Sequence, residues 1–392
     1  MKTIGIIAEY NPFHTGHAWH ITQTRRLFQE ETAVVAVMSG NWVQRGECAI
    51  ADKWTRTEMA LSGGADLVLE LPTVWATASA EGFARGAVAL LAATGVANVL
   101  SFGSECGELT PLMELAQCLN SSDFAKALRR ELEPKRSFAQ CRRRAAAGLL
   151  GEKTASLLDF SNNNLGVEYL RFLPPNMEAV TIPRRGAGHD GETAEEFASA
   201  SLLRRWIRAG KAERASPFLP SPWRGEAADM KHLERALIAR LRSMTLAEAE
   251  ALPDSGDGLA ARLLYAARQT ADLEELYALT KTRTYTHARV RRLALYALLD
   301  LREEDRPAAP PYIRVLGFNR RGQALLREMN QSASLPFFVK PAHISRLSPE
   351  ARALFALEER FTDLFALCFP TPRPGGLEWT TNPVIKLQAS NR

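Results

Sequence analysis

The sequence predicts an α/β protein, with a doubly wound parallel sheet first and a mainly α-helical region after it. In the first part, short apolar runs alternate with helical patterns. The runs are almost continuously apolar, which is typical of parallel strands covered by helices on both faces. A chain of 392 residues is long enough for about two domains. We therefore expect an N-terminal domain of residues 1–215 and a C-terminal domain of residues 216–392.

The predicted strands of the first domain are rich in β-branched residues. They lie at residues 3–8, 33–38, 66–71, 98–102 and 177–182, with helical patterns between them. If the strand order is the common 3-2-1-4-5, the first and fourth strands are neighbours. The turns "NPFHTGH" and "GSECG" that follow them then meet in one crevice at the carboxyl edge of the sheet, where such sheets bind ligands.

The segment "SPFLPSPWRGEAAD" from Ser216 predicts a domain boundary, because its prolines and polar residues interrupt the alternation. Helices are predicted beyond it at "MKHLERALIARLRSM", "LAARLLYAARQT", "DLEELYALT" and "HARVRRLALYALLDLR", where apolar residues recur every three or four positions. After "REEDRPAAPP" we expect strands at "YIRVLGF" and "LPFFVK" and a final helix at "PEARALFALEERFTDLF".

Composition sets limits on the class of protein. The balance of 49 basic and 44 acidic residues gives a net charge of +5, which allows a local basic patch but does not by itself indicate nucleic-acid binding. The five cysteines form no C-x-x-C pair, so neither a disulfide framework nor a zinc knuckle is supported. No leader pattern and no apolar run of about 18 residues is present. We expect a soluble cytoplasmic protein with no membrane association.

The motif H-x-G-H, made by His14, Gly16 and His17, stands between the first strand and the next helix. Thr15 is the expected N-cap, and a helix N-terminus in this place attracts phosphate. Imidazole N–H groups there can stabilise the charge that develops during attack at phosphorus. The alternative is that these are surface or capping histidines. His20, one turn further on, belongs either to the same site or to the helix surface.

A second motif, S-x-S-x-x-R, is made by Ser199, Ser201 and Arg204 at the start of a predicted helix. Two hydroxyls and a guanidinium can converge there on the outgoing phosphates, since the arginine fork binds phosphate oxygens in pairs. The alternative is an ordinary capped amphipathic helix. With H-x-G-H upstream, we favour the phosphate site.

The loop after the second strand places Asn41, Gln44 and Arg45 near the same edge of the sheet, either as ligand contacts or as a solvated connection. The segments "SNNNLGVEYL" and "IPRRGAGHDG" supply asparagines that can read an adenine or ribose edge and arginines that can stack on a base.

In the C-terminal half, "KTRTYTHARVRR" interleaves basic and aromatic residues, which suits a nucleic-acid backbone with a stackable base. A solvated helix face is the competing interpretation. The basic residues that we single out are Arg283, Arg289, Arg291 and Arg292.

Together these motifs resemble those of one family, the bacterial tRNA(Met) cytidine acetate ligases, which have a nucleotidyltransferase-like (HUP-like Rossmann) domain. The resemblance covers most of the chain in order. It runs through "GIIAEYNPFHTGHAWH", "MSGNWVQRGECAIADKW", "GADLVLELP", "SFGSE", "NNNLGVEYL", "RRGAGHD", "ASASLLR" and "YIRVLGFNRRG".

The resemblance implies a reaction in two steps. Acetate attacks the α-phosphate of ATP to give acetyladenylate and pyrophosphate, and the N4 amine of the wobble cytidine (C34) of elongator tRNA(Met) then takes the acetyl group. The partners implied are tRNA(Met) and acetate, with no obligate protein partner. Magnesium is expected with ATP, although no carboxylate cluster identifies its ligands.

The resemblance also implies which residues bind ATP: the segment from Ile7 to His20, Gly103, an asparagine of one pair and an arginine of another. His14 and His17 would stabilise the transition state at the α-phosphate. With the S-x-S-x-x-R residues, the expected ATP site comprises Ile7, Ala8, Glu9, Tyr10, Asn11, Pro12, Phe13, His14, Thr15, Gly16, His17, His20, Gly103, Asn162 or Asn163, Arg184 or Arg185, Ser199, Ser201 and Arg204.

Two other functions are compatible with parts of the pattern. An adenylyltransferase that makes a dinucleotide-type cofactor explains both motifs equally well, but leaves the locally basic helical half without a task. A non-catalytic RNA-binding protein with a relic nucleotide site explains that half, but the intact histidine pair argues against it.

Overall fold

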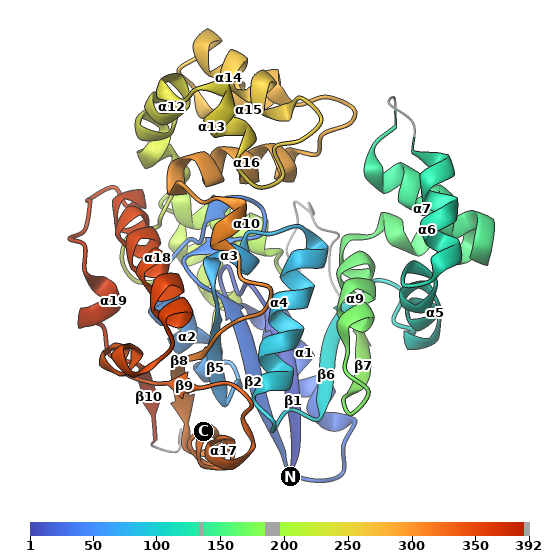
Figure 1. The fold of residues 1–392 in the computed structure, drawn as a ribbon. Helices are drawn as coiled ribbons and strands as arrows, with labels where there is room; N and C mark the ends of the chain where they lie inside the picture. The colour runs from blue at the N-terminus through green and yellow to red at the C-terminus, as the bar shows by residue number, and fades with distance from the viewer. Residues whose placement is uncertain (133–135, 185–196, 388–392) are drawn as a thin grey trace.

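The computed structural model describes residues 1–132, 136–184 and 197–387 (Figure 1). Its centre is an eight-stranded sheet in the order β10-β8-β5-β2-β1-β6-β7, with β9 paired to β8. The strands are β1 Lys2–Ala8, β2 Thr32–Ser39, β5 Leu67–Leu71, β6 Val99–Ser104, β7 Glu178–Pro183, β8 Ile313–Asn319, β9 Phe337–Phe338 and β10 Val384–Lys386. The five strands expected in the first domain all form, and their order β5-β2-β1-β6-β7 is the predicted 3-2-1-4-5.

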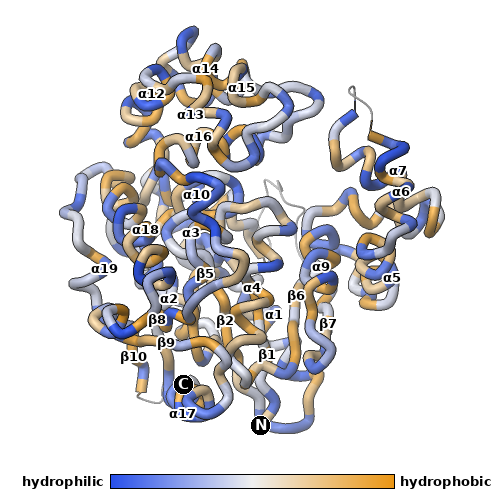
Figure 2. The backbone as a smooth tube through the Cα atoms, viewed as in Figure 1, coloured by the Kyte–Doolittle hydropathy of each residue, from blue (hydrophilic) through white to orange (hydrophobic). Residues whose placement is uncertain are grey.

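Strand β2 shows why the sequence folds this way. All of its residues are buried, because helices cover both faces of the sheet. Its odd-numbered residues from Ala33 to Val37 belong to one core with α4 (Ala80–Ala93). Its even-numbered residues from Val34 to Met38 belong to another core with α1 (Thr15–Arg26), α2 (Lys53–Ser62) and α10 (Ala200–Arg208). Figure 2 shows apolar residues along the central strands and α4.

The remaining helices form three groups. Those flanking the sheet are α1 Thr15–Arg26, α2 Lys53–Ser62, α3 Thr73–Ala76, α9 Ser161–Phe172, α10 Ala200–Arg208, α11 Ala212–Ala215, α17 Arg320–Ser332, α18 Pro349–Phe365 and α19 Leu377–Thr380. To one side stand α5 Leu109–Leu119, α6 Ser122–Glu131, α7 Phe138–Leu150 and α8 Glu152–Ala155. A helical module consists of α12 Glu234–Ser243, α13 Leu246–Glu250, α14 Leu259–Gln269, α15 Leu273–Thr280 and α16 His287–Leu299.

The C-terminal part of the chain returns to the sheet. β8 pairs antiparallel with β5, and β9 and β10 pair in parallel with β8. The chain beyond residue 216 therefore adds β8, β9 and β10 to the same sheet as the strands before it. "YIRVLGF" and "LPFFVK" contain the expected strands β8 and β9, and the expected final helix is α18.

A buried cluster of charges fastens this returning segment. Lys53 Nζ lies 2.6 Å from Glu70 Oε1 and also pairs with Glu378. Arg314 pairs with both carboxylates, at 3.3 Å from Glu70 Oε2. All four side chains are almost completely buried. Because β5, α2, β8 and α19 each contribute one of them, the cluster connects the N-terminal part of the sheet to the segment that returns to it.

The helical module sits above the carboxyl ends of the central strands (Figure 1). A two-stranded hairpin, β3 Trp42–Val43 and β4 Glu47–Cys48, connects it to the sheet. Glu47 of this hairpin pairs with Arg291 of α16. Gly46 has φ +75°, and a Cβ atom there would lie 2.4 Å from the main-chain N of Arg292, so only glycine allows this contact. Within the described residues, no helix is long and apolar enough to cross a membrane.

Candidate active site

Helix α1 begins with a reciprocal cap made by two histidines. His14 is the N-cap residue, and its Nδ1 accepts a hydrogen bond of 3.0 Å from the main-chain N of Gly16. Nδ1 of His17 accepts one of 3.2 Å from the main-chain N of His14. The expectation that Thr15 is the N-cap is therefore wrong: the His14 ring occupies that role, and Thr15 is the first residue of the helix.

This cap decides which protonation state the histidines adopt. Since Nδ1 accepts a hydrogen bond in both rings, each neutral imidazole carries its proton on Nε2. Burial lowers the pKa of His14 to about 3, helped by the charges of Arg184 and Arg204. Burial and then His14 lower the pKa of His17 well below its ordinary value. Both rings are neutral at pH 7 and have Nε2–H groups to donate.

Gly16 is required by the same geometry. A Cβ atom at this position would lie 2.8 Å from Cε1 of His14. The glycine thus makes room for the capping ring.

His20 links α1 to the sheet. Its Nε2 lies 2.9 Å from Oγ of Ser101 on β6, and Ser101 in turn lies 2.7 Å from Oγ1 of Thr24. Burial lowers the pKa of His20 to about 4, and the charge of Arg184 adds to this effect. One ring nitrogen of His20 therefore holds the helix in place.

The turn between β1 and α1 is held by side chains from two helices. Arg204 donates from Nη1 to the main-chain O of Asn11 at 2.7 Å, and Arg56 donates from Nη1 to that of Glu9, also at 2.7 Å. The side chain of Asn11 accepts a hydrogen bond of 2.7 Å from the main-chain N of Ile50. The peptide bond between Asn11 and Pro12 is cis. Three hydrogen bonds, from Arg204, Arg56 and Ile50, thus hold the turn that leads to the histidines.

The S-x-S-x-x-R residues support that turn. Ser199 is the N-cap of α10, and its Oγ accepts from the main-chain N of Leu202 at 3.2 Å. Ser201 Oγ accepts from Nη2 of Arg204 at 3.2 Å. The capped helix that we considered as the alternative is present, and it places Arg204 in contact with the turn between β1 and α1.

A second group of hydrogen-bonded residues at the carboxyl edge of the sheet comes from the ends of β6 and β7 and the start of α9. The carboxylate of Glu105 accepts from the main-chain N of Asn162 at 3.1 Å and from that of Asn163 at 2.7 Å. Asn163 is completely buried, and its Oδ1 accepts from the main-chain N of Glu105 at 2.8 Å. Asn162 is more exposed, and its Oδ1 accepts from Nη1 of Arg184 at 2.9 Å.

Arg184 also connects this group to the histidines. A Cβ atom at Gly103 would lie 3.4 Å from Cγ of Arg184, and the charge of Arg184 helps to lower the pKa of His14 after burial. Gly103, Asn162 and Arg184 are thus brought to the histidine crevice, as the strand order required. Arg185 lies outside the described residues.

The remaining candidates are divided between core and surface. Asn41 is buried, and its Nδ2 donates to Oγ1 of Thr362 at 3.0 Å, so it lies in the interior. Gln44 and Arg45 are half-buried in the turn of the hairpin, and the main-chain N of Gln44 donates to Oε1 of Glu9 at 2.9 Å.

Three of the four arginines singled out in the helical module are paired with acids. Arg289 lies 3.1 Å from Asp257, Arg292 lies 3.2 Å from Asp254, and Arg291 pairs with Glu47 and Glu274. Arg283 is exposed and forms no ion pair in the described part of the chain.

The comparisons with known proteins agree with this geometry. A model of the HIGH Nucleotidyl Transferase family matches residues 1–376. The tRNA(Met) cytidine acetate ligase of Caldanaerobacter subterraneus subsp. tengcongensis is 36% identical over 99% of this chain and 100% of its own length. That of Acetivibrio thermocellus is 34% identical over 98% of this chain and 100% of its own length. This chain belongs to the tRNA(Met) cytidine acetate ligase family.

Solved structures point the same way, so the resemblance noted in the sequence is confirmed. The crystal structure of Thermotoga maritima TmcAL has a TM-score of 0.92 and 31% identity, and covers 99% of this chain and 100% of its own. A second structure, of T. maritima TmcAL bound with alpha-thio ATP, has a TM-score of 0.89.

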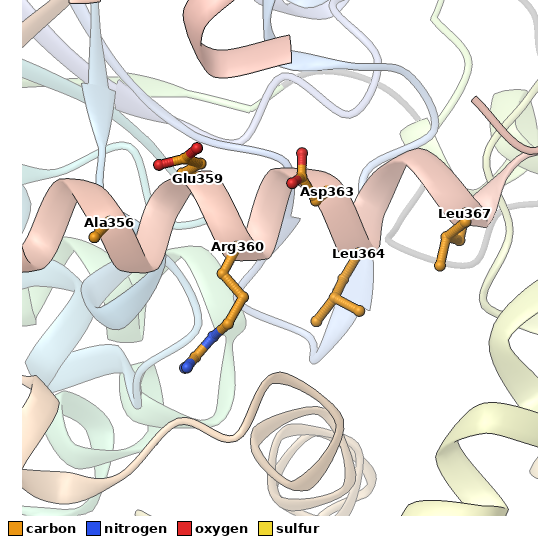
Figure 3. A pocket seen from close by; sticks show the side chains of 6 residues that line it. All are labelled: Ala356, Glu359, Arg360, Asp363, Leu364 and Leu367. Atoms are coloured by element: carbon orange, nitrogen blue, oxygen red, sulfur yellow. The ribbon is translucent and has the colours of Figure 1, made fainter. Parts of the chain in front are cut away.

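Two cavities in the described part of this member of the ligase family are lined by residues other than His14 and His17. One, of about 370 Å³, lies along α18 and is lined by Ala356, Glu359, Arg360, Asp363, Leu364 and Leu367. Figure 3 shows that Glu359 and Asp363 leave the helix on the side opposite Arg360 and Leu364. Asp363 accepts from the main-chain N of Gly376 at 2.7 Å, which gives it a structural role. The other cavity, of about 560 Å³, lies between α17 and β9.

No group of three or more His, Cys, Asp or Glu side chains in the described residues is arranged to hold a metal ion. Mg²⁺ commonly keeps several waters and binds through substrate phosphates with one or two carboxylates. An ion that arrives with ATP therefore does not need a protein cage in this ligase.

The sequence analysis of this ligase missed two residues that position its site. Arg56 is completely buried and holds the main chain of Glu9, and Glu105 fixes the two asparagines at the start of α9. A signal existed for each. Both are charged residues close after the carboxyl end of a strand or in the helix that follows, where the ends of parallel strands converge.

Proposed function

We propose that this chain is an ATP-dependent ligase that activates acetate as acetyladenylate with release of pyrophosphate, then acetylates N4 of the wobble cytidine of elongator tRNA(Met). The observation that carries the proposal is the reciprocal histidine cap. It leaves each ring with a neutral Nε2–H donor at the positive end of α1, the helix that follows β1, and β1 is the neighbour of β6 in the sheet. Neutral donors of this kind stabilise the charge that develops on an α-phosphate during attack.

The surrounding residues have separate tasks in this proposal. The turn from Glu9 to Phe13 offers its main chain to the nucleotide. Arg184 supplies positive charge beside the histidines, and Asn162, held by Glu105 and Arg184, faces the adenosine side of the crevice. Arg204 keeps the turn in place. Magnesium accompanies the phosphates of ATP.

The tRNA approaches from the side of the helical module, which sits above the carboxyl edge. Lys281 and Arg283, in the loop before α16, are exposed and form no ion pairs in the described part of the chain, so their charges are available to phosphates. Arg45 lies at the turn of the hairpin between this module and the nucleotide crevice, also without an ion pair among the described residues, and contacts the anticodon loop.

One assay tests the proposal. The protein is incubated with ATP, radiolabelled acetate and total tRNA, and the tRNA is digested to nucleosides. Label in N4-acetylcytidine, dependent on ATP, is the expected result. Transfer of an adenylyl group to a small molecule without label in tRNA would instead indicate a dinucleotide-forming adenylyltransferase.

A further inference from the structure

The side chain of Glu9 occupies a particular place in the crevice. Glu9 directly follows β1, and its main-chain oxygen is fixed by the buried Arg56 at 2.7 Å. Its Oε1 accepts a hydrogen bond of 2.9 Å from the main-chain N of Gln44 in the hairpin. Its Oε2 has no hydrogen bond within the described residues. The carboxylate is thus anchored by one oxygen and open at the other.

Charged and polar groups face Glu9 from three helices. Burial lowers the pKa of Arg204 on α10, and the carboxylates of Glu47 and Glu9 oppose this effect. Burial raises the pKa of Tyr169 on α9, and the charge of Glu9 adds to it. Arg56 reaches Glu9 from α2. The carboxylate therefore lies where these helices converge on the turn to His14.

The hairpin that anchors Glu9 also contacts the helical module, through Glu47 and Arg291. Glu9 is thus linked through the hairpin to the helical module, the side from which the tRNA approaches in the proposed function, and the same turn leads from Glu9 to the histidines at the start of α1. A base that serves the second chemical step has to be in this position.

Three other carboxylates at the carboxyl edge, those of Glu105, Asp52 and Glu47, are already engaged. Glu105 accepts three hydrogen bonds, from main-chain and side-chain groups at the start of α9. Asp52 caps α2 at 2.8 Å from the main-chain N of Thr55, and its other oxygen lies 3.3 Å from Arg373. Glu47 pairs with Arg291.

The histidines are also unsuited to accept a proton. Nδ1 of His14 and of His17 already accepts a main-chain hydrogen bond, and Nε2 of each carries a proton. They are donors in this crevice, and a separate base is required.

The chemistry of the second step defines what that base does. The N4 amine of cytidine is a weak nucleophile, because its lone pair is delocalised into the ring, and attack on the acetyl carbonyl makes the nitrogen acidic. We propose that the free oxygen of Glu9 is the general base for acetyl transfer. The N–C bond forms, the C–O bond to the phosphate breaks, AMP leaves with that electron pair, and one N4 proton passes to Glu9. This inference rests on the proposed function.

The test separates the two steps. Acetate-dependent exchange of pyrophosphate into ATP reports the first step. Single-turnover transfer from preformed enzyme-bound [¹⁴C]acetyladenylate to saturating tRNA(Met) reports the second. The variant Glu9→Gln keeps an amide oxygen that accepts from Gln44, so the hairpin stays anchored. We expect its transfer rate to fall by about 10²-fold or more, with a much smaller effect on exchange.

Two further variants control for position. Glu47→Gln changes a carboxylate of the same hairpin and is expected to transfer acetyl at the wild-type rate when tRNA is saturating. Glu9→Asp retains a carboxylate and is expected to recover part of the transfer rate that Glu9→Gln loses. A melting temperature for each variant establishes that it is folded.

The outcomes are distinguishable. Wild-type protein without acetate-dependent exchange, or without transfer to tRNA, would overturn the proposed function itself. If the wild type performs both steps and Glu9→Gln transfers at a normal rate, the proton goes elsewhere, for instance to the leaving phosphate, and only the role of Glu9 is refuted. Equal loss in Glu9→Gln and Glu47→Gln would also refute it, because the effect would then come from the hairpin.

Discussion

Arg204 donates a hydrogen bond of 2.7 Å to the main-chain oxygen of Asn11, so a side chain from α10 fixes the turn that leads into α1. The two residues lie far apart in the sequence. Their contact makes the position of His14 depend on the folding of α10, because Asn11 is three residues before the capping histidine.

Replacing Arg204 with lysine is expected to weaken ATP binding. Lysine retains the charge but lacks the fork that holds both Asn11 and Ser201. Loss of these charged hydrogen bonds costs about 1.5–3 kcal/mol of stability. Thermal unfolding and the KM for ATP measure the two effects. Arg205→Lys, at the exposed neighbouring position, is the control, and equal effects in both variants would contradict the contact.

His17→Ala is expected to slow acetate-dependent pyrophosphate exchange by about 10²–10³-fold, because one hydrogen-bond donor to the developing charge is lost. Binding of tRNA, measured by filter retention, should not change. His343→Ala, at an exposed position outside the crevice, serves as the control. Full exchange activity in His17→Ala would remove this histidine from the mechanism.

The histidine cluster predicts a loss of stability in mild acid. Burial lowers the pKa of His20 to about 4, against about 6.5 in an unfolded chain. As pH falls from about 6.5 towards 4, the unfolded chain takes up the proton and the native state does not, so each such histidine costs about 1.4 kcal/mol per pH unit. The free energy of unfolding, measured with urea between pH 7 and about 5, should therefore decrease less steeply with falling pH for His20→Gln than for the wild type. Identical slopes would contradict the assignment.

The buried charge cluster predicts a large effect at Lys53. Lys53→Met leaves Arg314 as the one cation of this cluster facing the two carboxylates of Glu70 and Glu378, and breaking a buried ion pair in this way costs about 3–5 kcal/mol. Chemical denaturation measures the loss. Lys386, which lies 3.5 Å from the exposed Glu58, offers the matched control, since Lys386→Met should cost about 1 kcal/mol or less.

The arginines of the helical module are expected to differ in their effect on tRNA. Arg283→Ala removes an exposed charge and should lower the slope of log affinity against log salt by about 1. Arg292→Ala removes a partner of Asp254, so it should reduce stability with little change in that slope. A salt series of binding measurements compares the two. If Arg292→Ala lowered the slope and Arg283→Ala did not, the RNA contact would lie on α16.

The strands were predictable because both faces of the sheet are covered, so each strand is an apolar run with a helix after it, and the order found is the common order of such sheets. The crevice followed from that order. The cap of α1 was not predictable from the sequence, because a histidine ring is a rare N-cap and Thr15 has the more usual side chain.

Long-range contacts were the other part that the sequence did not reveal. Glu70 in "LVLEL" signals a buried partner, but its two partners, Lys53 and Arg314, come from other segments of the chain. The arginines of α16 gave an ambiguous pattern, because the acids that neutralise them lie in a separate loop and in the hairpin. Periodicity reports the face of a helix and carries no information on such partners.

The position of β8 has a consequence for synthesis on the ribosome. β5 hydrogen-bonds to β8 along one edge, and residues 313–319 leave the ribosome long after Leu71 does. Until then the backbone groups on that edge of β5 have no strand to pair with, and open edges of this kind promote association between chains. A fragment that stops near residue 215 is therefore expected to aggregate, even though it contains both histidines of the crevice.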